Sequence, residues 1–236
     1  MSRPPGALRV RFSTRSLTGA ALHPDCVEAV ENTARLLEGL GHEVEEFHLP
    51  ADLDVRAMML AWTKIVACGT ALTVRSYLGD TPLDPTLIEG VTRGALTYAD
   101  TVSGADYLAA VNAVHAFGRR MAHVFDDCDV LLTPTLAAPP APVGQYKPDN
   151  EDFLDYRTGK GGVFDYSPFT AIFNASGQPS VSLPLHWSGD GLPVGLHLAM
   201  GFGDDERLMS LCAQIDAAAP WAPMQQTLLT KGGIAG

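Results

Sequence analysis

Residues 8–49 read LRVRFSTRSLTGAALHPDCVEAVENTARLLEGLGHEVEEFHL, and this stretch predicts a strand, a helix and a second strand. Residues 8–12 alternate apolar and basic side chains, which is typical of a strand with one exposed face. A helix is expected from Pro24, because proline suits the first position of a helix, and Gly41 suits its end. The apolar stripe of this helix consists of Val27, Val30, Ala34, Leu37 and Leu40. Residues 44–49 then form the second strand, which we expect to be parallel to the first with a right-handed crossover.

A helical region is expected to follow this unit. Residues 53–78 and 84–96 are helical in composition, and Ser103 with Asp106 resembles a capping box at the start of a long helix. The expected apolar stripe of that long helix is Leu108, Val111, Val114, Gly118, Met121 and Phe125. Residues 129–133 then predict a short apolar strand.

The remainder of the chain predicts a second group of strands. Residues 137–162 are rich in proline, glycine and charge, and we interpret them as one long loop inside the domain. After a short helix near 169–174, a buried strand at 181–183 and a strand at 194–200 form a hairpin, and a final helix begins at Asp204. The predicted fold class is therefore α/β, with a mixed central sheet flanked by helices, and residues 1–236 form a single domain.

Composition restricts the possible functions. With 46% hydrophobic and 18% charged residues, the chain has the composition of a soluble globular protein. The formal charge of −11 disfavours binding to nucleic acid or to an anionic membrane surface. The longest apolar stretches are broken by charge or proline, and the first ten residues lack an export signal. Together with four cysteines that form no CxxC pair, these features favour a cytoplasmic protein.

Several short motifs resemble known binding or catalytic motifs but lack residues that those motifs require. The sequence from Gly201 to Glu206 has no third glycine and carries two aspartates where a dinucleotide phosphate would bind, so it predicts a tight turn. Residues 158–162 lack the serine or threonine of a phosphate loop and predict a flexible loop. His115 is expected to be a partly buried histidine and not a ligand, and no HExxH or GxSxG motif occurs. We therefore expect no cofactor and no metal site.

Longer motifs resemble those of a known family. They occupy residues 129–135, 167–184, 191–198, 203–208 and 219–221, and the opening strand and helix agree with them. The sequence resembles the C-terminal half of the amidase-signature enzymes over nearly its whole length. It is most similar to the branch that acts on small linear and cyclic amides. Asn174, Gly177 and Pro179 are interpreted as residues that shape the turn before a strand.

The resemblance implies an amidase, a hydrolase that cleaves carbon–nitrogen bonds in carboxamides. Its Ser–Ser–Lys triad would lie in an N-terminal half, because this chain contains no Gly-Gly-Ser-Ser-Gly stretch and no lysine in a matching context. We therefore assign no catalytic residue and predict that the chain alone is inactive. The resemblance places Ser167, Phe169 and Thr170 beside the substrate.

Two further hypotheses remain. The chain could be a catalytically inactive or split fragment that acts as a non-enzymatic folding or assembly partner and forms a homo-oligomer through its sheet edges. It could also be an unrelated small-molecule binding module. A reading frame upstream of Met1 that encodes a serine- and glycine-rich loop would favour the enzyme, which would bind a small amide once an N-terminal half completes it.

Overall fold

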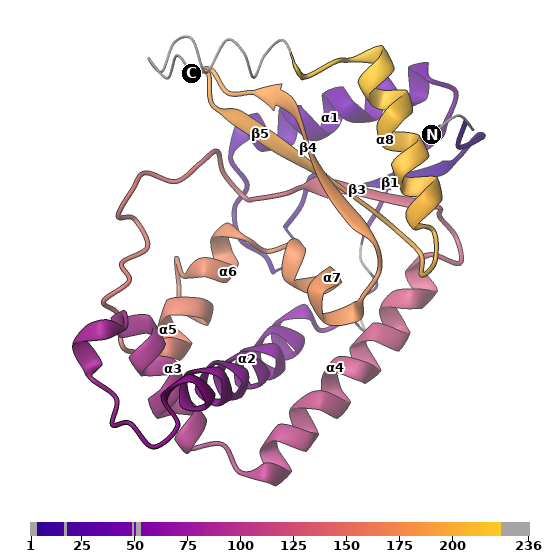
Figure 1. Ribbon diagram of the computed structural model, residues 1–236. Helices are drawn as coiled ribbons and strands as arrows, with labels where there is room; N and C mark the ends of the chain where they lie inside the picture. The colour runs from indigo at the N-terminus through magenta and orange to yellow at the C-terminus, as the bar shows by residue number, and fades with distance from the viewer. Residues whose placement is uncertain (1–3, 17, 49, 51–52, 223–236) are drawn as a thin grey trace.

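A five-stranded mixed sheet forms the centre of the molecule (Figure 1). The computed structural model describes residues 4–16, 18–48, 50 and 53–222. The strands are β1 (Arg9–Phe12), β2 (Glu43–Glu46), β3 (Val130–Pro134), β4 (Ser180–Trp187) and β5 (Pro193–Met200), in the order β2-β1-β3-β5-β4. The first three are parallel, whereas β5 runs antiparallel to both β3 and β4. The predicted mixed α/β architecture is confirmed.

Helices pack on both faces of this sheet. One face contacts α1 (Pro24–Gly39) and α8 (Asp205–Ala218), and the other faces a layer built around α7 (Thr170–Ser176). Figure 1 shows this second layer extending away from the sheet. Its remaining members are α2 (Val55–Leu78), the 3₁₀ turn η1 (Pro85–Leu87), α3 (Gly90–Asp100), α4 (Gly104–Val124), α5 (Phe153–Thr158) and α6 (Val163–Tyr166).

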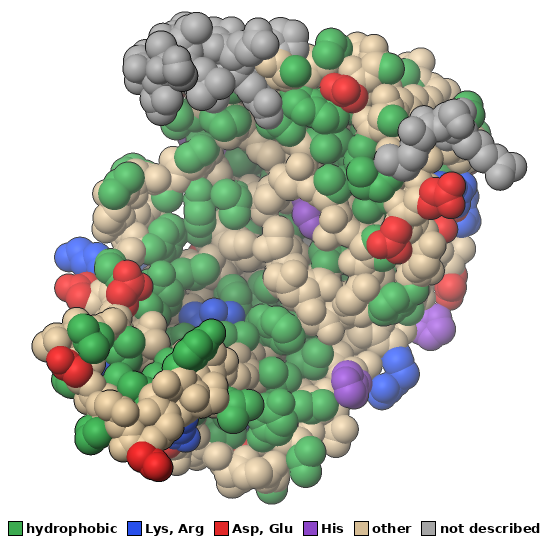
Figure 2. Space-filling view, in the orientation of Figure 1, with side chains coloured by type: hydrophobic (Ala, Val, Ile, Leu, Met, Phe, Trp, Pro, Cys, Tyr) green, Lys and Arg blue, Asp and Glu red, His purple; other side chains and the backbone are tan. Residues whose placement is uncertain are grey.

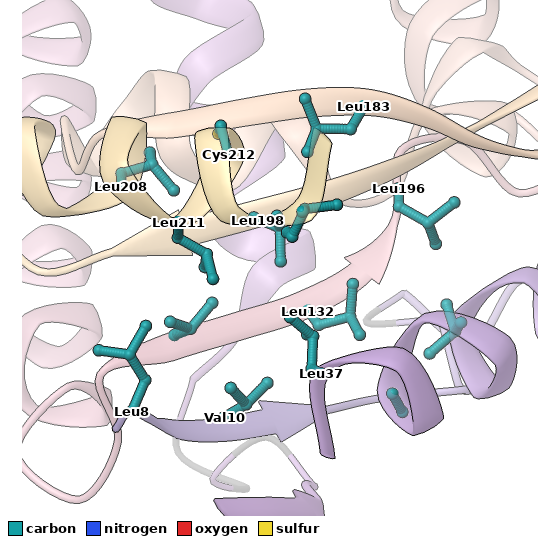
Figure 3. Close-up of a cluster of buried hydrophobic side chains, with 14 of the residues drawn as sticks. Leu8, Val10, Leu37, Leu132, Leu183, Leu196, Leu198, Leu208, Leu211 and Cys212 are labelled. Carbon is teal, nitrogen blue, oxygen red and sulfur yellow. The ribbon is translucent and has the colours of Figure 1, made fainter. Parts of the chain in front are cut away.

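The larger hydrophobic cluster joins α1 and α8 to the sheet (Figure 3). Leu132 and Leu198 are fully buried on neighbouring strands, with Leu37 of α1 and Leu211 of α8 packed against them. Burying each such side chain contributes roughly 1.5–3 kcal/mol. Because successive side chains of β3 and β5 point to opposite faces, the opposite face is left to Leu131, Ala199 and a row of polar residues.

The predicted strand, helix and strand at the N-terminus are confirmed. β1 and β2 are parallel, α1 begins at Pro24, and Gly41 follows its last residues with a φ of +91°. That left-handed conformation is one that glycine adopts without strain. The second strand ends at Glu46, earlier than predicted, and Leu49 lies outside the described residues.

The long helices are confirmed, with three corrections. The capping box of α4 forms in both directions between Ser103 and Asp106. The predicted helix 84–96 is instead η1 followed by α3, because Glu89 between them is extended. In α4, Leu108 is 62% exposed. His115 is exposed and not partly buried. Val114 and Met121 of the predicted stripe are buried, whereas the other buried residues, Ala110, Phe117 and Val124, each lie one position before a predicted member.

The segment 137–162 is not one loop. It contains α5, which is capped by a hydrogen bond of 2.9 Å from the Asp155 amide to the Asp152 carboxylate. Before α5, the backbone at Asp149 and Glu151 crosses α3 so closely that a Cβ on Gly90 or Gly94 would overlap it. The segment therefore has the composition of a loop, but its backbone packs against α3.

The strand β4 is also more exposed than the predicted buried strand 181–183. Only Leu183 is buried among these three residues, and Ser182 is exposed. The reason is that β4 is the last strand of the sheet, with a partner on one side only in the described structure. Gly177, with a φ of +83°, ends α7 just before this strand, as the turn prediction requires.

By length and composition alone, α2 is apolar enough to cross a membrane, although core helices of soluble proteins also pass this test. Its buried side chains include Met58, Ala67 and Ala71, and it packs against α3 and α4. Figure 2 shows apolar side chains gathered over α2 and α4 on the viewed face.

Candidate functional site

A row of polar side chains crosses the sheet on the face opposite α1 and α8. His197 of β5 stands in register between Thr133 of β3 and Ser182 of β4. Thr135 lies two residues after Thr133, and its hydroxyl group is 2.6 Å from the hydroxyl group of Ser182. They meet above Gly195, where a Cβ would lie 2.7 Å from the serine oxygen. Glycine at this position therefore allows the two hydroxyl groups to hydrogen-bond across β5.

His197 is a buried and uncharged member of this row. Its side chain is 4% exposed, and its ring lies 5.0 Å from the ring of Phe173 of α7. Burial lowers the pKa of His197 to about 4, so the imidazole is neutral at pH 7. Its Nδ1 atom has no hydrogen-bond partner among the described residues. The ring can therefore accept or donate one hydrogen bond, but it is a poor base at neutral pH.

The predicted substrate residues lie at the start of α7. The backbone amide of Ala137, just after β3, donates to the carbonyl of Tyr166 at 2.8 Å, which places the chain before Ser167 beside the end of that strand. Ser167 and Thr170 are half-buried, and their hydroxyl oxygens are 2.9 Å apart. Phe169 is fully buried. The two hydroxyl groups thus remain candidates for substrate contact, whereas the buried phenyl ring of Phe169 is not exposed to a ligand.

A pocket of about 220 Å³ lies between α2 and α6. We call it the α2–α6 pocket, and its lining residues are Thr18, Arg56, Met59, Leu60, Thr158, Phe164 and Asp165. None of the three predicted substrate residues lines it. The methionine, leucine and phenylalanine form apolar walls, and the arginine and aspartate bring one charge of each sign. Such a pocket suits a short apolar chain that carries polar ends.

One wall of this pocket has a signal in the sequence. Arg56, Met59 and Leu60 are three and four residues apart, so they share one face of a helix. The other lining residues are far away in the sequence, and no periodic pattern connects them to this face.

The guanidinium of Arg157 lies over two aromatic rings next to this pocket. Its central carbon is 5.4 Å from the ring centre of Phe153 and 4.7 Å from that of Phe164. Its Nε donates to the hydroxyl of Thr63 at 3.3 Å. Burial lowers the pKa of Arg157, and none of the residues described makes an ion pair with it.

The catalytic groups of a Ser–Ser–Lys triad are not assembled in the described part of the chain. Lys64, Lys147 and Lys160 form no hydrogen bond with a serine there, and Lys231 lies outside the described residues. Nor does that part contain a group of three or more histidine, cysteine, aspartate or glutamate side chains that could hold a metal ion.

Comparison with known proteins identifies the family. The model of the Amidase family matches residues 3–209. The chain is 29% identical to 6-aminohexanoate-cyclic-dimer hydrolase from Paenarthrobacter ureafaciens, over 97% of this chain and 48% of that protein. It is 32% identical to putative amidase AmiC from Mycobacterium leprae, over 94% of this chain and 46% of that protein.

A solved structure shows the same fold. The structure of 6-aminohexanoate cyclic dimer hydrolase complexed with substrate has a TM-score of 0.82 and 27% identity, and the match covers 93% of this chain and 47% of that one. The chain thus spans about half the length of the curated relatives it matches. The resemblance expected from the sequence motifs is confirmed, and the chain belongs to the Amidase family.

Proposed function

We propose that this chain is the substrate-shaping, C-terminal half of an enzyme that hydrolyses the carbon–nitrogen bond of small carboxamides. The observation that carries the proposal is the match of residues 3–209 to the Amidase family, together with the half-length coverage of its relatives. One relative is named for hydrolysis of 6-aminohexanoate cyclic dimer, an aliphatic amide. An aliphatic amide of this kind is the substrate class that we propose here.

The proposed division of labour follows from the two groups of site residues. The α2–α6 pocket would bind the methylene chain against Met59, Leu60 and Phe164, because burial of apolar surface is favourable. The hydroxyl groups of Ser167 and Thr170 would hydrogen-bond to the amide group. A nucleophile and its base would come from a second polypeptide segment, since a serine hydroxyl needs an adjacent base to attack an amide.

Binding of hexanamide to the purified chain tests this proposal. Leu60→Trp should fill the pocket and weaken binding by about tenfold or more, as expected for the steric loss of an apolar site. Leu72→Trp is the matched control, because Leu72 lies on the same helix, is 71% exposed and does not line the pocket. Calorimetric titration gives both dissociation constants. Equal weakening by the two variants would contradict the assignment of the pocket.

The same samples test the expected lack of catalysis. Hydrolysis of hexanamide by the chain alone should not exceed the buffer blank, because no serine–lysine hydrogen bond occurs in the described residues. Turnover above that blank would overturn the proposed division into two halves.

The absence of a serine–lysine hydrogen bond from the described residues also supports a second candidate function, that of a non-enzymatic folding or assembly partner. Binding of hexanamide that is sensitive to Leu60→Trp favours the enzyme half. No binding by the wild-type chain favours the assembly partner.

A further inference from the structure

The contacts of Arg157 with two aromatic rings and a hydroxyl group connect the elements that build the α2–α6 pocket. The arginine belongs to α5, its two rings come from α5 and α6, and its hydrogen-bond acceptor Thr63 belongs to α2. Thr63 in turn donates to the carbonyl of Met59 at 2.8 Å. Both Met59 and Phe164 line the pocket. A single side chain therefore contacts one wall directly and reaches the other through one hydroxyl group.

The chemistry of this contact is specific to a guanidinium group. A partly buried cation such as Arg157 normally pairs with a carboxylate, and none of the described residues supplies one. The negative faces of two phenyl rings compensate the charge instead, and a flat guanidinium can lie against both while its Nε still donates. A lysine ammonium group is compact and carries no planar surface, so it could not make all three contacts.

We propose that Arg157 is a positioning residue for substrate binding, because it holds the Phe164 ring in place as a wall of the α2–α6 pocket. Arg157 does not line the pocket, so it acts through Phe164 and does not touch the ligand. The inference rests on the proposed function for the identity of the ligand. The clamp on the ring is a property of the chain alone and can be measured without any ligand.

The ligand-free measurement uses 4-fluorophenylalanine incorporated at position 164 and observed by fluorine NMR. The wild-type chain should give one narrow line, because the ring has a single position. Arg157→Met should shift or broaden that line, Arg157→Lys should have an intermediate effect, and Arg119→Met should have none. Arg119 is the matched control because it is an exposed arginine on α4. An unchanged line in Arg157→Met overturns the proposal.

The binding measurement uses hexanamide and a double-mutant cycle. Arg157→Met should weaken binding by about tenfold, a loss in the range of a desolvated cation–π contact. In a Phe164→Leu background the same change should weaken binding by less than about twofold, because the ring through which it acts is gone. A loss that stays tenfold in that background overturns the proposal.

These two measurements separate failure of the clamp from failure of the proposed function. If the fluorine line responds to Arg157→Met but the wild-type chain binds no hexanamide, the clamp stands and the assignment of the pocket to an aliphatic amide is wrong. If hexanamide binds and neither measurement responds to Arg157→Met, the clamp is wrong and the proposed function stands.

Discussion

At the scale of single residues, two buried histidines are held in their neutral form. Burial lowers the pKa of His197 to about 4 and lowers the pKa of His42 as well. The Nδ1 atom of His42 accepts a hydrogen bond of 3.2 Å from the amide of Leu8, and its Nε2 lies 3.1 Å from the side-chain oxygen of Gln214. A proton on Nδ1 would break the first of these bonds. Both histidines therefore resist protonation in the folded state.

The stability of the protein should fall in mild acid. A histidine whose folded pKa is depressed contributes fully above its unfolded pKa of roughly 6.5 and loses its contribution as the pH falls toward the folded value. For His197 the window runs from about pH 6.5 to about 4, and the loss is up to about 3 kcal/mol. Thermal unfolding followed by near-UV circular dichroism between pH 7.5 and 4.5 measures it.

His197→Gln should flatten this pH dependence, since glutamine stays neutral in the same place. His115→Gln is the control, because His115 is exposed and should leave the acid loss unchanged. An equally steep loss in His197→Gln would show that other groups cause the acid sensitivity.

Some individual residues could be identified from the sequence and others could not. Ser167 and Thr170 could be proposed as substrate contacts because the motif that contains them is contiguous in the sequence. Phe169 belongs to the same motif but is fully buried, and a motif alone does not show which of its members face solvent. His197 sits next to Ser182 and Thr133 only because three separate strands align. No local pattern contains that information.

At the scale of secondary-structure elements, the contact between α3 and the segment before α5 fixes a stretch that has the composition of a loop. The amide of Val91 donates to the carbonyl of Pro148 at 2.8 Å, and Arg93 pairs with Glu151 at 2.7 Å. Gly90 and Gly94 provide the close approach. Small residues on one helix face thus convert a polar, proline-containing segment into a fixed one.

Gly94→Ala should destabilise the protein by about 1–3 kcal/mol, because the new methyl group overlaps the backbone of Glu151. Gly69→Ala is a matched control within α2. Its Cβ would meet nothing within 4 Å, so alanine should stabilise the helix by up to about 1 kcal/mol. Urea unfolding gives both changes, and a neutral Gly94→Ala would contradict the close packing.

Element prediction succeeded where the signal was local and failed where a neighbour decides. The cap of α4 was predictable from Ser103 and Asp106, which are three residues apart. The buried face of α4 is the one that packs against α2 and α7, and the sequence alone does not predict where these two helices lie. For the same reason, the residues at 181–183 predict an apolar strand but not that it lies at the edge of the sheet.

At the scale of the whole molecule, the chain presents unpaired sheet edges and exposed apolar side chains. In the described structure β2 and β4 are the outer strands, and β2 carries Glu43, Glu45 and Glu46, whereas β4 contains no aspartate, glutamate, lysine or arginine. Charged edge strands resist pairing with another chain. Exposed apolar residues elsewhere include Leu72, Tyr77, Leu87 and Leu108. The β4 edge is therefore the more open of the two.

The isolated chain should self-associate at micromolar concentration. Ser180→Lys places a charge on an exposed position of β4 and should reduce the association, whereas Ser76→Lys at the exposed end of α2 should not. Size-exclusion chromatography with light scattering measures the mass of each variant. A compact wild-type monomer would contradict the prediction.

The overall fold was predictable in class but not in arrangement. The first strand, helix and strand are local, so their parallel pairing followed from the sequence. The pairing of β1 with β3 joins residues such as Val10 and Val130, and the sequence predicted a mixed central sheet without indicating that these two strands are neighbours. The α2–α6 pocket likewise combines Thr18, Leu60 and Asp165, which are distant in the sequence.

The link between Arg9 and Asp129 has a consequence for synthesis on the ribosome. The Arg9 amide donates to the Asp129 carboxylate at 2.7 Å, and the edge of β1 that faces β3 pairs only with residues about 120 positions later. Until β3 has left the exit tunnel, the edge of β1 that will pair with β3 stays unpaired while the intervening helices emerge. Long-range pairings of this kind slow folding and expose the chain to aggregation. Nascent chains that end before residue 130 should therefore depend on chaperones more strongly than those that extend past it.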